Sequence, residues 1–188
     1  MMTEKQTTAK IIAVQDDIVS IKTDAGASTP LTKNEVVYIL PGRSSTPYTE
    51  RLKAEVLRIK GDTADAQVYE STQGVGVGDP VEQTGEMLSV ELGPGLLGHV
   101  YDGLQNPLLD LASGYGFFLP RGLDLPALDI NAKWAFTPCV QTGDILKIGS
   151  VIGTVIERGF THKIMLPFDL EDEVEVSWIQ EGQVTVLE

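Results

Sequence analysis

Residues 67–109 have the sequence QVYESTQGVGVGDPVEQTGEMLSVELGPGLLGHVYDGLQNPLL. Glycines stand at positions 74, 76 and 78, and Asp79 and Pro80 follow them directly. Because Gly and Pro interrupt helices and strands, this stretch predicts turns between the segments on either side of it. We therefore expect two separate β-rich units joined by residues 67–109.

The glycine cluster at positions 74–78 also invites comparison with phosphate-binding loops. Such a loop leads into the N-terminus of a helix, whereas Pro80, Val81 and Glu82 show no helical periodicity. The cluster also lacks the Gly-Lys-Ser/Thr ending of a P-loop. It therefore favours a turn over a ligand-binding loop.

The composition limits the classes of partner. The 188 residues include 14 Lys and Arg against 27 Asp and Glu, which gives a net charge of −13. Such a surface repels phosphate backbones and anionic lipids, so we expect no nucleic-acid binding and no direct membrane contact. The single cysteine, Cys139, excludes an internal disulfide. No apolar run approaches the roughly 18 residues of a membrane-spanning helix.

Short β-branched segments precede the glycine cluster. They predict strands at residues 10–14, 18–23, 36–40 and 64–69, and the ambiguous segment 48–60 is assigned to a further strand. The first two flank a polar turn and predict a hairpin. Thr32 and Glu35 have the spacing of a helix capping box, but the β-branched run after them favours a strand. A small closed barrel would remove the edges of these strands.

The strand pattern is interrupted after residue 109 and resumes towards the C-terminus. Residues 110–138 carry aromatic side chains among Gly and Pro, and they predict an irregular segment. In residues 173–179 acidic and apolar side chains alternate, which predicts a strand with one solvent-exposed face and with Trp178 on the other. A second β-unit is therefore expected, with strands at 151–156, 162–166, 173–179 and 183–187.

No set of side chains predicts catalysis, cofactor binding or metal binding. His99 and His162 are the only histidines and stand far apart, so each is assigned a structural role. Cys139 has no identifiable base and is predicted to be a core residue. The carboxylates at 16–17 and 171–173 lie in polar turns, where solvation explains them.

A carrier domain is one alternative. Residues 143–149, the strands after them and Lys163 resemble a biotinyl or lipoyl domain, which presents its modified lysine at an exposed hairpin tip. Lys163 follows His162 and begins an apolar run, so it is predicted near the start of a strand. A free-standing β-barrel interaction module is the other alternative.

Distinctive short motifs run from about residue 50 to the C-terminus. They are QVYEST (67–72), GDPV (78–81), TG (84–85), LSVELGPGLLG (88–98), YDGLQ (101–105), RG (121–122), PALD (126–129), WAFTP (134–138), GD (143–144), GTV (153–155) and HKIMLP (162–167). In order and spacing they resemble the catalytic A subunit (alpha chain) of V-type and archaeal-type rotary ATPases. Asn106 stands where many members have arginine, and a Gly-Pro-Val of the family is absent, which indicates a divergent bacterial branch.

The resemblance implies a mainly β fold in three parts. These are an N-terminal β-barrel at residues 1–70, the first strands of an incomplete nucleotide-binding domain at 71–109, and an inserted, barrel-sandwich-like bulge domain at 110–188. It also implies that the barrel meets neighbouring subunits of a catalytic hexamer and that the bulge domain meets the peripheral stalk. The parent would couple ATP hydrolysis or synthesis to proton or sodium transport, in the cytoplasm at the membrane periphery.

The family's phosphate loop, catalytic glutamate and adenine pocket lie beyond the matched region, so no residue here corresponds to them. The resemblance therefore implies a structural and assembly role for these 188 residues, with ATP and Mg²⁺ bound only by the full-length parent. It also implies that apolar surface is exposed along residues 70–109, where the rest of the domain would pack, and that the isolated chain dimerises or is locally disordered there.

Overall fold

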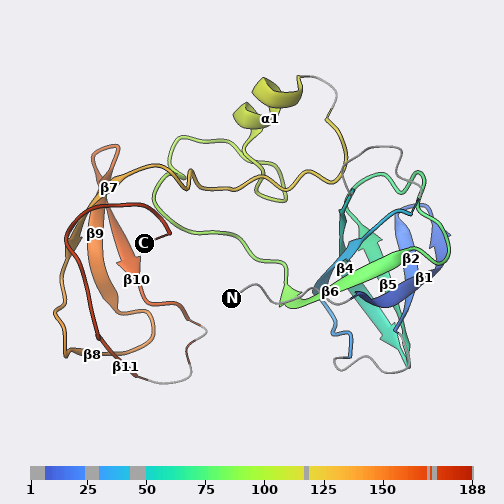
Figure 1. The fold of residues 1–188 in the computed structure, drawn as a ribbon, viewed down its shortest axis with the longest axis horizontal. Coiled ribbons are helices and arrows are strands. Elements are labelled where there is room, and N and C mark those ends of the chain that lie inside the picture. Colours follow the sequence, from blue (N-terminus) through green and yellow to red (C-terminus); the bar gives the residue numbers. More distant parts are fainter. Residues whose placement is uncertain are drawn as a thin grey trace. The chain divides into compact units, whose positions relative to one another are not determined.

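The computed structural model describes residues 7–23, 30–42, 50–116, 119–168, 170 and 173–187. These residues divide into two compact units, one within 1–89 and 117–124 and the other within 90–116 and 125–188. Both units are built mainly from strands (Figure 1). The mainly β fold expected from the sequence is therefore confirmed.

The first unit is a closed barrel of six strands in the order β1-β2-β5-β4-β3-β6. Every neighbouring pair in the barrel is antiparallel. The strands are β1 (Thr7–Gln15), β2 (Ile18–Thr23), β3 (Glu35–Ile39), β4 (Leu52–Lys60), β5 (Thr63–Val68) and β6 (Pro80–Met87). The predicted hairpin and the strands predicted before the glycine cluster are therefore confirmed.

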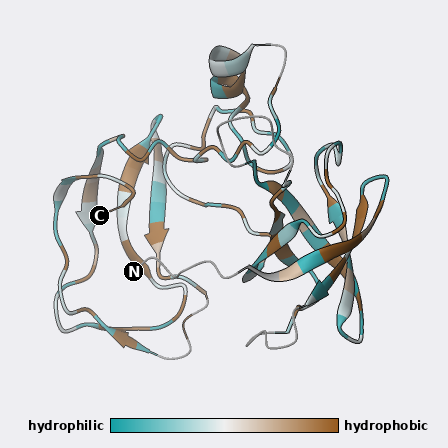
Figure 2. Ribbon diagram, turned by 45° about the vertical axis from the view of Figure 1, so that its right-hand side comes forward, coloured by the Kyte–Doolittle hydropathy of each residue, from teal (hydrophilic) through white to brown (hydrophobic). Residues whose placement is uncertain are grey.

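The barrel interior is filled largely by alternate side chains of its strands. In β5, Ala64, Ala66 and Val68 are buried, while the residues between them are only partly buried. Figure 2 shows this alternation of hydrophobic and hydrophilic positions along the barrel strands. Successive side chains of a strand point to opposite faces, so a period-two sequence supplies one apolar face for the core.

The barrel was expected to end near residue 70, but it extends to β6. β6 lies between β1 and β3, and Val81 is the partner of both Ala9 and Ile39. Its side chain is fully buried in the core. Without β6 both β1 and β3 would have an open edge, so the barrel takes its last strand from within residues 71–109.

The described residues of the second unit form two small sheets and one helix. One sheet has the strand order β10-β9-β7-β12, and the other pairs β11 with β8. The elements are α1 (Leu108–Tyr115), β7 (Trp134–Pro138), β8 (Ile145–Leu146), β9 (Val151–Glu157), β10 (Phe160–Met165), β11 (Val174–Glu175) and β12 (Gly182–Val184). None of the helices in the described ranges has the length and apolar character needed to cross a bilayer.

Two local predictions in this unit were wrong. Residues 110–138 were expected to be irregular, but they contain most of α1, with Pro107 before the helix and Leu111 buried, and they end in strand β7. The strand predicted at 173–179 is limited to Val174–Glu175, and Trp178 is 67% exposed. β11 is short because its partner β8 has only two residues, and a strand persists only as far as a neighbour pairs with it.

Candidate functional site

The glycine cluster at 74–78 is a turn of the first unit, as predicted. The carboxylate of Asp79 accepts hydrogen bonds from the N–H of Gly76 (2.7 Å) and of Gly42 (3.1 Å). The N–H of Gly78 donates to the carbonyl of Ile11 on β1 (2.8 Å). The Asp79 carboxylate thus accepts a hydrogen bond from an amide of the cluster, and the loop serves as the turn that joins β5 to β6.

Each histidine contacts another side chain of the protein. Nδ1 of His162 lies 3.0 Å from Oε2 of Glu157, and the ring of His99 lies tilted against Tyr101 at 6.4 Å between centroids. In the part of the chain that the structure describes, no three His, Cys, Asp or Glu side chains are grouped so as to hold a metal ion.

Cys139 is exposed, so its assignment to the core was wrong. In residues 133–139 the exposed positions alternate with partly buried ones, and Cys139 falls in the exposed phase. Its thiol donates a hydrogen bond to the carbonyl of Val151 (3.2 Å).

Of the two acidic groups predicted to lie in polar turns, 16–17 and 171–173, the structure describes the first fully and the second only in part. Asp17 lies in the turn between β1 and β2, where its carboxylate accepts a hydrogen bond from Gln67 (2.9 Å). Glu173 is exposed and lies 3.6 Å from Lys147. The neighbouring acidic positions 171 and 172 lie outside the described residues.

Lys163 lies inside β10, opposite Thr154 of β9. The tip of this hairpin is formed by Arg158 and Gly159. A swinging-arm carrier presents its lysine at the tip, so the position of Lys163 in mid-strand does not favour the carrier alternative.

Residues 119–124 belong to the barrel unit although residues 90–116 do not, and we call them the return segment. Their sequence alone indicates no role. The Arg121 guanidinium pairs with both oxygens of Glu50, at 3.0 Å each. It also donates to the carbonyls of Ser71 (2.7 Å) and Gln73 (2.5 Å). A planar guanidinium suits this two-pronged pairing with a carboxylate, so Arg121 fixes the return segment to the barrel unit.

Gly122 adds a second attachment. Its N–H donates to Oε2 of Glu70 at 2.7 Å. Its φ is +72°, and a Cβ at this position would lie 3.0 Å from the backbone nitrogen of Arg51, so only glycine fits. Burial raises the pKa of Glu70, although the Gly122 N–H and the Arg121 charge act in the opposite direction.

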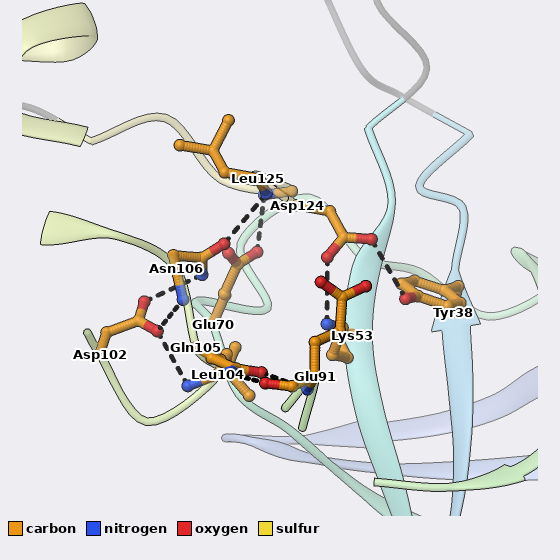
Figure 3. Close-up of polar contacts among 11 residues, drawn as sticks. Tyr38, Lys53, Glu70, Glu91, Asp102, Leu104, Gln105, Asn106, Asp124 and Leu125 are labelled. Atoms are coloured by element: carbon orange, nitrogen blue, oxygen red, sulfur yellow. Dashed lines mark hydrogen bonds and ion pairs between the residues drawn. The ribbon is translucent and has the colours of Figure 1, made fainter. Parts of the chain in front are cut away.

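Asp124 provides the third attachment. Its carboxylate lies 3.2 Å from Nζ of Lys53 and accepts a hydrogen bond from the hydroxyl of Tyr38 at 3.4 Å (Figure 3). Burial, followed by the negative charge of Asp124, raises the pKa of Tyr38. Arg51 stacks over the Tyr38 ring at 4.0 Å from its centroid and pairs with Glu82 at 2.6 Å. Tyr38 of β3 and Lys53 of β4 thus hold the return segment at Asp124, and Arg51 links Tyr38 to Glu82 of β6.

Asn106 organises the turn before α1 in the second unit. Its backbone N–H and its side-chain amide donate to the two oxygens of Asp102 (2.8 and 2.9 Å), and its own Oδ1 accepts the N–H of Leu125 (3.1 Å). The side chain of the neighbouring Gln105 exchanges two hydrogen bonds of 2.7 Å with the backbone of Glu91 (Figure 3). Asn106 is buried, so at this position the amide acts as a structural link.

A second glycine pattern was missed at the sequence level. Residues 93–98, GPGLLG, have the spacing G-x-G-x-x-G, but no strand leads into them and no helix follows directly, so the dinucleotide-binding context is absent. The N–H groups of Gly95 and Leu97 both donate to Oε1 of Glu157, at 2.8 and 2.9 Å. The anion held by this loop is therefore a side chain of the protein itself.

The expected exposure of apolar surface along residues 70–109 is confirmed. Several large aliphatic side chains of this stretch are more than half exposed, and Leu92 is 83% exposed. They are Val77, Met87, Val90, Leu92, Val100 and Leu109. Together with the polar attachments of the return segment, these exposed apolar side chains are the features of the described residues that suit contact with further protein.

Comparison with known proteins gave matches in both units. A family model described as the ATP synthase alpha/beta family, beta-barrel domain, matches residues 43–85. A second, the ATPsynthase alpha/beta subunit barrel-sandwich domain, matches residues 125–188.

Curated relatives match nearly the whole chain. It is 47% identical to the V-type ATP synthase alpha chain of Treponema denticola over 182 residues, which are 96% of this chain and 29% of that protein. The alpha chain of Borrelia recurrentis is 47% identical over 94% of this chain and 29% of its own length. Alpha chain 1 of Treponema pallidum is 48% identical over 93% and 28%. The chain thus spans less than a third of the length of these relatives.

Proposed function

Because the chain belongs to the ATP synthase alpha/beta family and corresponds to the N-terminal part of V-type alpha chains, we propose that it is the structural and assembly region of such a subunit. The observation that carries this proposal is the 47% identity over 96% of the chain. Both the barrel and the barrel-sandwich unit lie within the matched length, so the similarity covers the whole architecture rather than one motif.

The parent subunit, in this proposal, hydrolyses or synthesises ATP in a rotary ATPase that moves protons or sodium ions. The barrel meets neighbouring subunits of the hexamer, and the barrel-sandwich unit meets the peripheral stalk. The parent complex lies in the cytoplasm and reaches the membrane through its other subunits. The closed barrel supports this role, because a barrel without open edges offers side-chain surfaces for specific contacts and avoids uncontrolled strand pairing.

Nucleotide chemistry is assigned to segments outside these 188 residues. We therefore expect isothermal titration calorimetry of the 188-residue chain with Mg-ATP to give no binding heat. A matched titration of a longer product of the same gene, extended through any downstream G-x-x-x-x-G-K-[ST] motif, should give binding. Tight binding by the 188-residue chain itself would overturn the assignment.

The gene provides an independent check. If the chain is part of an alpha subunit, the reading frame should continue past codon 188 into a sequence that encodes G-x-x-x-x-G-K-[ST]. A natural stop codon directly after Glu188 would instead favour a free-standing β-barrel interaction module.

A further inference from the structure

The loop at residues 93–98, which we call the GPGLLG loop, has the features of an anion-binding nest. The backbone N–H groups of Gly95 and Leu97 converge on one point, and convergent N–H groups form concave sites that favour negative charge. Oε1 of Glu157 occupies that point at 2.8 Å from the first nitrogen and 2.9 Å from the second. The nest is therefore filled from within the chain.

The occupying carboxylate is fixed on its other side as well. Glu157 is the last residue of β9 and only 2% exposed, and its Oε2 lies 3.0 Å from Nδ1 of His162 on β10. Burial by itself would raise the pKa of Glu157, but the N–H groups of Leu97 and Gly95 and the contact with His162 outweigh it and lower that pKa. The carboxylate is therefore charged at neutral pH, when its hydrogen bonds are strongest.

The first and last glycines of the GPGLLG loop lie close to the ends of neighbouring side chains, and Gly98 has a φ of +81°, which favours glycine. A Cβ on Gly93 would lie 2.8 Å from Cδ1 of Leu128, and a Cβ on Gly98 would collide with the guanidinium of Arg158. Arg158 directly follows Glu157, so two consecutive residues contact the loop. In this loop, Gly93 and Gly98 thus allow close packing against neighbouring side chains, and Gly95 donates its N–H to Glu157.

From this geometry we propose that Glu157 is a positioning residue that acts as the permanent internal anion of the GPGLLG loop. It joins the loop to β9, so that the loop and the β9–β10 sheet move as one body. It also keeps the amide nest closed to external anions such as a phosphate. This inference goes beyond the proposed assembly role. Its test uses the chain alone, so the internal-anion role of Glu157 and the assembly role can fail independently.

The test compares two variants at this position with a matched control. Glu157→Ala removes the anion, and Glu157→Gln keeps the shape of the side chain but removes the charge. Glu181→Gln neutralises an exposed carboxylate in the same unit. Amide hydrogen exchange, followed residue by residue by NMR in the 188-residue chain, reports on the N–H groups of Gly95 and Leu97.

Loss of charge-assisted hydrogen bonds should accelerate exchange at Gly95 and Leu97 by roughly tenfold to a hundredfold in both Glu157 variants. Amides of β9 away from the loop should change by less than about threefold, and the control should resemble the wild type. If Glu157→Ala prevents folding, Glu157→Gln carries the test.

Chemical rescue separates an anion requirement from a general packing defect. Sodium formate supplies a small carboxylate that fits the space left by Glu157→Ala, and it should restore much of the protection at Gly95 and Leu97. Sodium chloride at the same ionic strength should not. Unchanged exchange in both variants, or loss of protection that formate fails to reverse in a folded Glu157→Ala protein, would refute the internal-anion role.

Discussion

Replacing Arg121 with methionine should detach the return segment from the barrel unit. The guanidinium makes a two-pronged pair with Glu50 at 3.0 Å per contact and donates to two carbonyl groups. The side chains of Arg121 and Glu50 are 28% and 14% exposed. Methionine keeps much of the aliphatic volume, so the change removes mainly the charge and the hydrogen bonds.

The size of the expected stability loss follows from the partial burial of this ion pair. Fully exposed ion pairs contribute about 0–1 kcal/mol, whereas hydrogen bonds to charged groups contribute about 1.5–3 kcal/mol. The pair is partly screened by solvent, but its loss leaves the Glu50 carboxylate without its cation and two carbonyl groups without a donor. We therefore expect Arg121→Met to lower the free energy of unfolding of the barrel unit by roughly 2 kcal/mol.

The two units allow this effect to be located. Both tryptophans, Trp134 and Trp178, lie in the second unit, so intrinsic tryptophan fluorescence during urea unfolding reports on that unit. Far-UV circular dichroism reports on both units. In Arg121→Met the loss of stability should shift the unfolding transition seen by circular dichroism, while the midpoint seen by tryptophan fluorescence should stay unchanged. Hydrogen exchange at the Gly122 amide should become faster.

A matched control is available in the same unit. Arg58 pairs with Asp65 at 3.3 Å but is 76% exposed. Arg58→Met should therefore change the free energy of unfolding by less than about 0.5 kcal/mol. If the Arg121 and Arg58 variants lose the same stability, or if Gly122 exchange is unchanged in Arg121→Met, the anchoring role of Arg121 is wrong.

Three further outcomes are expected from buried and close-packed positions. Glu35→Ala removes a buried carboxylate that accepts three hydrogen bonds, from the N–H and hydroxyl of Thr32 and the N–H of Gly85, so it should cost about 1.5–3 kcal/mol in urea unfolding, and a loss below about 1 kcal/mol would contradict this. Gly153→Ala should destabilise the second unit in tryptophan fluorescence, because its Cβ would collide with the Phe136 ring, whereas Gly103→Ala has open space and should be nearly neutral. The folded-state pKa of Glu70 is raised, so its contribution to stability is full below the ordinary value of 4.5 and is lost as the pH rises through the folded value. Relative to Glu70→Gln, the wild type should therefore lose stability as the pH rises above the ordinary value of 4.5, and parallel pH profiles would contradict this.

Much of the barrel was predictable because its signals are local. The β-branched alternation of the first hairpin identifies two strands without reference to any partner. The spacing of Thr32 and Glu35 was also informative, although it marks a turn here. The Glu35 carboxylate accepts the Thr32 N–H at 2.8 Å, as in a capping box, but a strand follows in place of a helix.

The candidate site was less predictable because its contacts are distant in the sequence. Arg121 meets Glu50 across 71 positions, and Glu157 meets Gly95 across 62. The G-x-G-x-x-G spacing of residues 93–98 could have drawn attention to that loop, but the pattern does not indicate which anion fills it. Nothing in the local sequence marks Glu157 as that anion.

The sequence by itself determined the strand-rich character, the turn at the glycine cluster and, through motif order, the family. Only the tertiary structure decided that β6 closes the barrel, that the return segment is held by Arg121 and that Glu157 fills the GPGLLG loop. The physical reason is that alternation and turn propensity act between neighbouring residues. Edge closure and the pairing of buried charges depend on which distant segments the fold brings within hydrogen-bonding distance.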